Sequence, residues 1–242
     1  MAENLGQQFG VRGGATSAEL DQGLRSHMLK VYNYMSSGVL LTGIVAMFFA
    51  DAMIADPALK EMIFSGPLGL VLMFSPFIMV LVMSFGLNKL SPFALQACYW
   101  VFAALMGVSL SSVLLVYTGA SVAKVFFITA ATFGSLSLYG YTTKKSLSGM
   151  GSFLFMGLIG IIIASIVNMF LGSGLLDFVI SVIGVLVFAG LTAYDTQKIK
   201  QIYFEGHGTE SLAKLSIMGA LNLYLDFVNM FIFLLHLFGS RD

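Results

Sequence analysis

GLTAYDTQKIK at residues 190–200 and ALNLYLDFVNMFIFLL at residues 220–235 are two apolar segments, and each contains one aspartate. A carboxylate in a membrane helix is energetically costly, so Asp195 and Asp226 are the first residues to examine for function. A polar segment at 205–211 lies midway between them and predicts the turn of a helical hairpin. Two antiparallel helices that meet at this turn place both carboxylates at a similar depth, where they can share one proton.

The composition of the chain is that of a membrane protein. Hydrophobic residues make up 58% and charged residues 10% of its 242 residues, and the mean hydropathy is +0.92. The few charges are clustered between long uncharged runs, a distribution that a water-soluble domain of this size does not have. The net charge is zero and no basic arm is present, which argues against nucleic acid as a partner.

The chain is predicted to have two parts. Residues 1–28 are polar and rich in glycine, without the apolar core of a signal peptide, and we expect a flexible cytoplasmic tail there. Within it, Thr16 and Glu19 form a capping-box pattern that predicts a helix from about Ser17. Residues 29–242 are predicted to form a transmembrane domain of seven helices, which makes the chain an all-α membrane protein.

Seven apolar runs support this domain, and each is near the roughly 20 residues that a helix needs to cross a bilayer. An acidic loop at 51–61 is expected after the first run. Ser91 and Pro92 are good capping and first-turn residues for the third run. We expect the spans at about 31–50, 66–87, 91–117, 122–141, 152–171, from 177 to beyond 195, and at 215–238.

The distribution of Lys and Arg predicts the orientation in the membrane. Because cytoplasmic loops are enriched in these residues, the side that carries nine of them is expected to be cytoplasmic, and the N-terminus lies on that side. The last span is expected to cross fully, because about 24 residues suffice. The nine are Arg12, Arg25, Lys30, Lys89, Lys144, Lys145, Lys198, Lys200 and Lys214, and the opposite side holds Lys60, Lys124 and Arg241.

Polar residues recur with helical spacing around Asp226. Such stripes let helices approach each other and form hydrogen bonds between them. We expect Asn222 and Asn229, with Tyr194, to support the carboxylate pair. The stripe of the last span comprises Gly219, Asn222, Asp226, Asn229 and His236, and the fourth span contributes Thr129, Thr132, Ser135 and Tyr139.

The carboxylate pair is predicted to act as a pH-sensitive gate. Two carboxylates a few ångströms apart in poorly hydrated surroundings cannot both ionise freely, so the pair retains one proton. Loss of this proton introduces repulsion between Asp195 and Asp226 and loosens the two helices. Their oxygens are also the hard ligands that Ca²⁺ prefers, although two carboxylates make only a weak calcium site.

These two segments resemble the signature of the Bax-inhibitor family (transmembrane Bax inhibitor motif), in its bacterial YccA-like branch. The resemblance covers residues 30–239 and includes KLSP at 89–92 and ALMGVSLS at 104–111. It implies six helices wrapped around a central C-terminal helix in the bacterial inner (plasma) membrane. It also implies a pH-dependent calcium leak without a cofactor, in which Asp195 and Asp226 form a diaspartyl pH sensor.

The resemblance further implies a basic partner for the pair, supplied by the second span. The matching position is Lys89, a lysine where an arginine is usual, and a lysine does not form the two-pronged contact that arginine makes with a carboxylate. Lys89 lies at the inner end of its span, and its long side chain can reach toward the depth of the pair.

Two alternatives to a calcium leak remain open. Bacterial proteins that resemble this chain are associated with the membrane-bound ATP-dependent protease FtsH, so the first alternative is a non-conducting modulator of such a protease. The second is an intramembrane aspartyl protease, because Tyr194 and Asp195 match its Tyr-Asp motif. Its other motif, Gly-x-Gly-Asp, requires small residues where this chain has Leu223, Tyr224 and Leu225. We therefore expect no enzymatic activity.

Overall fold

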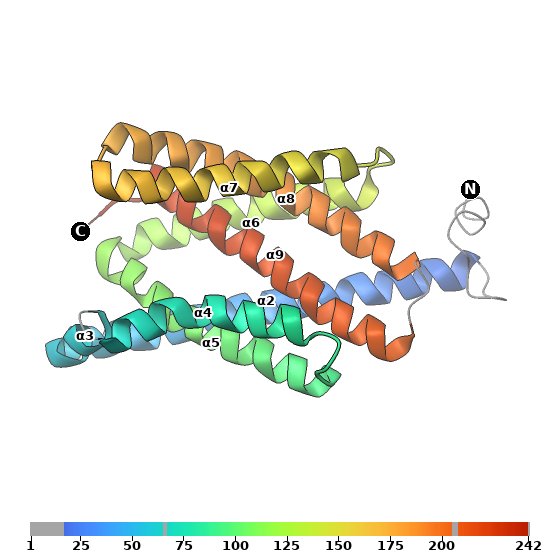
Figure 1. Ribbon diagram of the computed structural model, residues 1–242, viewed down its shortest axis with the longest axis horizontal. Helices are drawn as coiled ribbons and strands as arrows, with labels where there is room; N and C mark the ends of the chain where they lie inside the picture. The colour runs from blue at the N-terminus through green and yellow to red at the C-terminus, as the bar shows by residue number, and fades with distance from the viewer. Residues whose placement is uncertain (1–16, 65–66, 205–207, 242) are drawn as a thin grey trace. The chain divides into compact units, whose positions relative to one another are not determined.

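A computed structural model describes residues 17–64, 67–204 and 208–241, and nearly all of them are helical (Figure 1). Seven of the helices in these ranges are long and apolar enough to cross a membrane, and only the short α3 is not. The chain is therefore an all-α, multi-pass membrane protein, as predicted. The helices are α2 (Ser17–Ala55), α3 (Pro57–Phe64), α4 (Pro67–Gly86), α5 (Pro92–Val116), α6 (Gly119–Thr142), α7 (Ser148–Leu171), α8 (Gly174–Phe204) and α9 (Thr209–Phe238).

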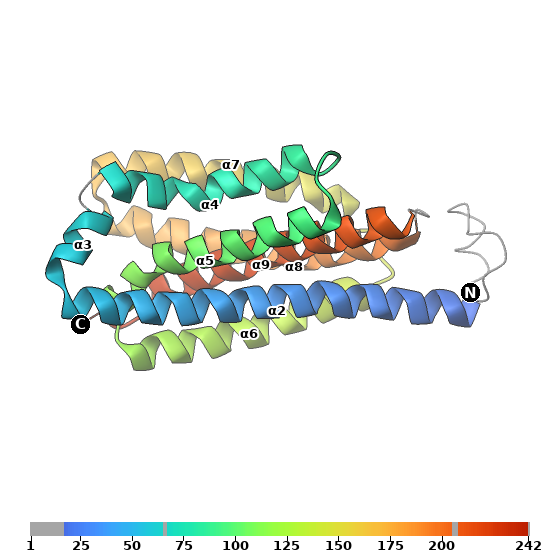
Figure 2. The ribbon, with the colours of Figure 1, turned by 90° about the horizontal axis from the view of Figure 1, so that it is seen from below.

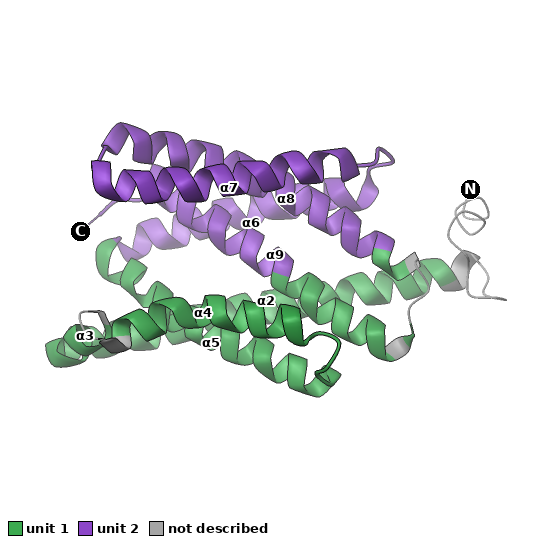
Figure 3. Cartoon of the chain, in the orientation of Figure 1, with its two compact units in different colours: residues 1–116, 202–221 green, residues 117–201, 222–242 purple. Residues whose placement is uncertain are grey.

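The chain divides into two compact units (Figure 3). Unit 1 comprises Met1–Val116 and Ile202–Leu221, and unit 2 comprises Tyr117–Gln201 and Asn222–Asp242. Helices α8 and α9 each contribute to both units. Both aspartates fall in unit 2, so the geometry of the pair can be described within that unit.

The first helix of unit 1 is longer than the membrane-crossing run that the sequence predicts. Figure 2 shows α2 as one unbroken helix, and it spans Ser17–Ala55. Residues 17–28, which the sequence assigned to the tail, form its first turns. Thr16, the expected capping residue, and the rest of the tail lie outside the described residues.

Helices α2 and α5 form a close seam in unit 1. The Tyr99 hydroxyl donates to the carbonyl oxygen of Tyr34 at 2.9 Å, and the Thr42 hydroxyl donates to that of Ala103 at 2.8 Å. Along this seam the residue numbers of α2 and of α5 increase in the same direction, so the two helices run parallel. With a rise of about 1.5 Å per residue in each helix, the start of α5 at Pro92 is level with roughly residue 30 of α2.

The prediction of an acidic loop at 51–61 is wrong, because most of these residues are helical. Helix α2 continues to Ala55, and α3 begins at Pro57. Asp56 separates them and accepts a hydrogen bond at Oδ1 from the backbone N–H of Ala58, at 3.0 Å. An aspartate at the cap followed by a proline in the first turn is a favourable start for a helix. Asp51 and Glu61 therefore lie within helices, and Asp56 caps the start of α3.

Helix α4 contains an internal proline, Pro76. A proline has no N–H, so the carbonyl of Leu72 loses its partner within the helix. Two hydroxyls donate to this carbonyl oxygen instead, from Ser75 at 2.8 Å and from Ser109 of α5 at 3.3 Å. Serine side chains that serve a freed carbonyl allow a proline in a helix surrounded by lipid.

In unit 2, the end of α9 lies beside the start of α6. The backbone N–H of Ser240 donates to the Ser121 hydroxyl at 2.9 Å, and the N–H of Thr118 donates to the Ser240 carbonyl at 3.0 Å. Helix α9 reaches this point without a break over 30 residues. An unbroken helix of this length supports the predicted full crossing. That the other six helices surround α9 stays a prediction.

Candidate carboxylate-pair site

The structure brings the two aspartates of the motif together. Asp195 lies on α8 and is half-buried, while Asp226 lies on α9 and is only 4% exposed. The carboxylates are close enough for the charge of Asp195 to act directly on Asp226. The two acids are thus within electrostatic reach of each other, and their sharing of one proton stays a prediction.

Asp226 has an unusual environment for a carboxylate. Its Oδ2 atom is fully buried, and within the described part of the chain no group forms a hydrogen bond with it. Buried carboxylate oxygens are almost always hydrogen-bonded or paired with a cation, because desolvating a charge is costly. This oxygen is therefore the position at which a proton or a cation would be bound most favourably.

Small residues allow the helices that carry the pair to pack closely. A Cβ atom at Gly184 of α8 would lie 2.5 Å from the ring of Phe233, so α9 packs directly against the α8 backbone. On the other side of α8, a Cβ at Gly140 of α6 would overlap the carbonyl oxygen of Ala193. Glycines at helix contacts let backbones approach in this way. Helix α8 thus packs against α6 beside Asp195, at Ala193, and against α9 about three turns earlier, at Gly184.

Lys198 is a basic neighbour of the pair that the sequence counted only for orientation. It lies one turn beyond Asp195 on α8, is exposed, and attracts the Asp195 carboxylate electrostatically. Its Nζ atom also lies 5.9 Å from the centre of the Tyr194 ring. Asp195 therefore has a positive charge nearby, at the more accessible end of the pair.

The residues expected to support the pair make other contacts. Tyr194 packs its ring against α7, where a Cβ at Gly151 would lie 2.6 Å from its Cζ atom. The Asn229 amide donates to the carbonyl oxygen of Leu225 in its own helix at 2.8 Å, and Asn222 is half-buried. Lys89 is exposed and belongs to unit 1. A supporting role for these four residues stays a prediction.

The residues that follow Asp195 attach α8 to α6. The hydroxyls of Thr196 and Ser137 are hydrogen-bonded at 2.9 Å, and both residues are buried. Further along, the Lys200 ammonium donates to the Tyr141 carbonyl oxygen at 2.9 Å and lies 5.1 Å from the centre of the Tyr141 ring. A cation at the last carbonyls of α6 also interacts favourably with its dipole.

Gln197 fixes the connection between α6 and α7. Its Oε1 accepts a hydrogen bond from the Leu147 N–H at 2.7 Å, and its amide donates to the Lys145 carbonyl oxygen at 2.9 Å. Leu147 precedes α7, which has no side-chain cap of its own. Sequence reasoning did not identify this role. The signal available was the run of polar residues directly after Asp195, at the end of an apolar helix.

Few side chains near the pair could coordinate a metal ion. Among residues 17–64, 67–204 and 208–241 no group of three or more His, Cys, Asp or Glu side chains could hold a metal ion. Asp195 and Asp226 would therefore have to bind Ca²⁺ as two carboxylates, together with backbone carbonyls or water. Such a set suits transient rather than tight binding.

A family model described as inhibitor of apoptosis-promoting Bax1 matches residues 24–242. The chain belongs to the Bax-inhibitor family. The inner membrane protein YbhL of Escherichia coli K12 is 46% identical over 222 residues, which cover 90% of this chain and 93% of YbhL. An uncharacterized protein of Rickettsia prowazekii is 47% identical over 221 residues, which cover 91% of this chain and 92% of that protein. The family predicted from the two aspartate segments is thereby confirmed.

Proposed function

We propose that this member of the Bax-inhibitor family is a pH-gated calcium-leak channel in which Asp195 and Asp226 form the titrating latch. The observation that carries the proposal is the fully buried Asp226 Oδ2, which lacks a hydrogen-bond partner among the described residues and is within electrostatic reach of Asp195. By analogy with YbhL, the membrane is the bacterial inner membrane. The excess of Lys and Arg on one side supports a cytoplasmic N-terminus.

In this mechanism one shared proton holds α8 against α9. When the proton leaves, two like charges face each other in poorly hydrated surroundings, and the closed arrangement becomes less favourable. The same pair of oxygens then attracts Ca²⁺, the permeant ion. Flux should therefore be low at acidic pH and rise as the pH increases.

Calcium flux into proteoliposomes across a pH series tests the proposal. The wild type should show a strong rise in flux with pH, whereas Asp195→Asn and Asp226→Asn should keep flux low at every pH, because asparagine cannot ionise. Asp177→Asn is the matched control, since Asp177 lies in the first turn of the same helix. This variant should retain the wild-type profile.

The alternatives are separated by the same preparations. A wild type without calcium flux, or flux that is indifferent to both substitutions, would contradict the leak and favour a non-conducting modulator of an FtsH-type protease. Cleavage of a helical peptide that is lost on either substitution would favour an aspartyl protease. Leu223 and Tyr224, both 0% exposed, argue against that activity, because they fill the space before Asp226 that a substrate backbone needs.

A further inference from the structure

An open groove lies between α2 and α5 of unit 1, away from the residues of the latch. Its volume is ≈ 610 Å³, and all of its lining residues come from these two helices. Its charged lining residues are Arg25 and Lys30, both exposed, and no carboxylate lines it. Neither cation forms an ion pair with any residue that the structure describes. The groove is thus positively charged.

The charge pattern of α2 places this groove at the membrane surface. Residues 31–50 are uncharged, and at about 1.5 Å per residue they span roughly 30 Å, the thickness of the hydrocarbon core. Lys30 is therefore the last charge before the hydrocarbon. The start of α5, which is level with about residue 30, marks the same boundary independently.

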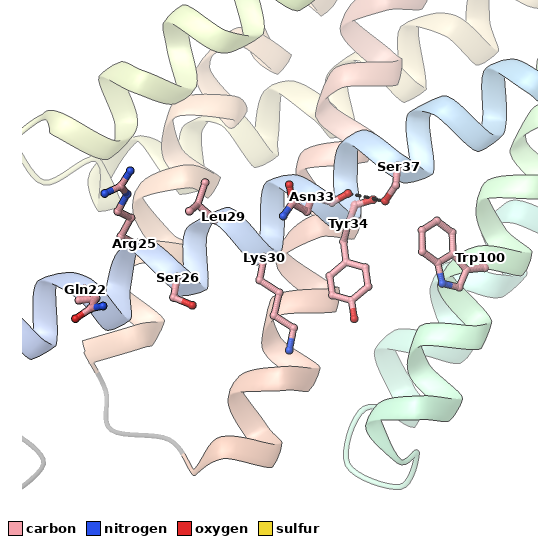
Figure 4. A pocket seen from close by; sticks show the side chains of 9 residues that line it. All are labelled: Gln22, Arg25, Ser26, Leu29, Lys30, Asn33, Tyr34, Ser37 and Trp100. Atoms are coloured by element: carbon pink, nitrogen blue, oxygen red, sulfur yellow. Dashed lines mark hydrogen bonds between the residues drawn. The ribbon is translucent and has the colours of Figure 1, made fainter.

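The deeper end of the groove is aromatic. Trp100 of α5 is the only tryptophan in the sequence, and its ring centre lies 6.4 Å from that of Tyr34 on α2. Figure 4 shows Lys30 and Tyr34 extending from the same side of α2. Tryptophan and tyrosine are enriched where headgroups meet acyl chains. The groove therefore changes from cationic to aromatic along the direction that leads into the bilayer.

We propose that this groove binds an anionic phospholipid, with its phosphate between Arg25 and Lys30 and its upper acyl chain against Trp100. Five residues turn a helix by about 140°, so the two cations lie at opposite edges of the groove. Ser26 and Asn33 lie between these edges and can donate hydrogen bonds to phosphate oxygens. Basic sites between membrane helices at this level suit anionic headgroups.

The surface beyond the groove favours a lipid over a soluble anion. Leu29 at the groove is 51% exposed, and Leu40 of α2 and Val101 of α5 are 64% and 50% exposed further in. A phospholipid covers this apolar surface and neutralises the cations at once, whereas a free phosphate does only the second. Lys30 should contribute more than Arg25, because Asp21 lies one turn before Arg25 and offsets its charge.

Quenching of Trp100 fluorescence by brominated lipids tests this proposal on the full-length protein. The protein is reconstituted in phosphatidylcholine vesicles that contain increasing mole fractions of either brominated phosphatidylglycerol or brominated phosphatidylethanolamine, with the same series for both lipids. Brominated phosphatidylglycerol should quench Trp100 at a lower mole fraction. Lys30→Gln should reduce this preference about fivefold, as expected for the loss of one interfacial charge. Arg25→Gln should reduce it less.

Two control variants separate charge from folding. Lys30→Arg should retain the preference, and Lys60→Gln, on α3 of the same unit, should leave it unchanged. Equal quenching by the two lipids, or the same loss with Lys60→Gln as with Lys30→Gln, would overturn the proposal. A Lys30-dependent change in Trp100 emission caused by soluble glycerol phosphate in zwitterionic vesicles would also overturn it, in favour of a free anion.

Discussion

Helices α7 and α9 are both long enough to cross a membrane, but their surroundings differ. In the most apolar 18-residue window of each helix, 11% of the residues are buried in α7 and 67% are buried in α9. Helix α7 contains no charged residue, whereas α9 carries Asp226 in its middle. The carboxylate thus lies on the more buried of the two helices, where a charge in a membrane protein is less costly than on a face exposed to lipid.

The contacts of α8 extend this comparison. The backbone of α8 at Ala193 packs against α6, and its Gly184 packs against Phe233 of α9. Against α7 the helix packs through side chains such as Val187. A cluster of Ile161, Ile180 and Val187 fills the space between α7 and α8. Substitutions at the backbone contacts should therefore have large effects, and those on the outer face of α7 small ones.

The largest effect is expected at the contact between α6 and α8. Gly140→Val should lower the free energy of unfolding by about 3 kcal/mol, because the new side chain meets the Ala193 backbone, which cannot rotate away. Thermal unfolding in detergent measures this effect. Gly134→Val, on the exposed side of the same helix with no atom within 4 Å of its Cβ, is the matched control. Similar losses in both variants would contradict the close contact.

The next largest effect concerns the pH dependence of stability. At pH 8 Asp226→Asn should raise the free energy of unfolding by about 2 kcal/mol, because Asp195 is within electrostatic reach of Asp226 and like charges repel each other strongly at low hydration. At pH 5, where the wild-type pair holds its proton, the gain should vanish. The wild type thus loses stability as the pH rises, and the variant does not. Parallel curves for the two proteins would show that the carboxylates do not interact.

A smaller effect is expected at the connection between α6 and α7. Gln197→Ala removes the hydrogen bonds to Leu147 and Lys145 and should cost about 1.5 kcal/mol, because the buried Leu147 N–H and the partly buried Lys145 carbonyl lose their partner. Hydrogen exchange at residues 145–149 should increase. Gln201→Ala, at an exposed position one turn further along α8, serves as the control. Unchanged exchange in Gln197→Ala would mean that the connection is held by other contacts.

The smallest effect is expected on the outer face of α7. Gly160→Ala meets no atom within 4 Å and should stabilise the protein by about 0.5 kcal/mol, through the higher helix propensity of alanine. At Gly157 the new Cβ would lie 3.0 Å from a methyl group of Val187 and should cancel this gain. The thermal unfolding midpoints of Gly160→Ala and Gly157→Ala show which of the two faces of α7 is packed against a neighbour. Equal midpoints would show that α7 has no packed face.

The sequence was sufficient for the spans but not for their ends. Lipid requires long apolar helices, so seven runs of the right length predict seven helices. Hydropathy identifies only the part of a helix that crosses the bilayer, however, and α9 begins at Thr209 rather than at about residue 215. For the same reason α7 begins at Ser148 rather than at 152, and the end of α2 was mistaken for a loop.

The two aspartates of the site could be predicted from the sequence, but most of their neighbours could not. Asp195 and Asp226 are conspicuous because carboxylates are rare in apolar helices. The roles of Gln197 and Lys200 were not predictable, because their partners are backbone groups that every residue supplies. The hydroxyl stripe of α6 was only partly informative. Thr129 and Ser135 bond to carbonyls of their own helix, while the hydroxyl that reaches α8 belongs to Ser137.

The attachment of α8 to its neighbours has a mechanical consequence. Thr196 and Gln197 directly follow Asp195, and Lys200 is one turn further on. A rotation of α8 at Asp195 would therefore pull on residues 137–147 through the hydrogen bonds of Thr196, Gln197 and Lys200. A rigid helix transmits such a displacement with little loss over one turn. In the proposed latch, a change in the protonation of the aspartate pair would therefore shift the connection between α6 and α7 as well as α8 itself.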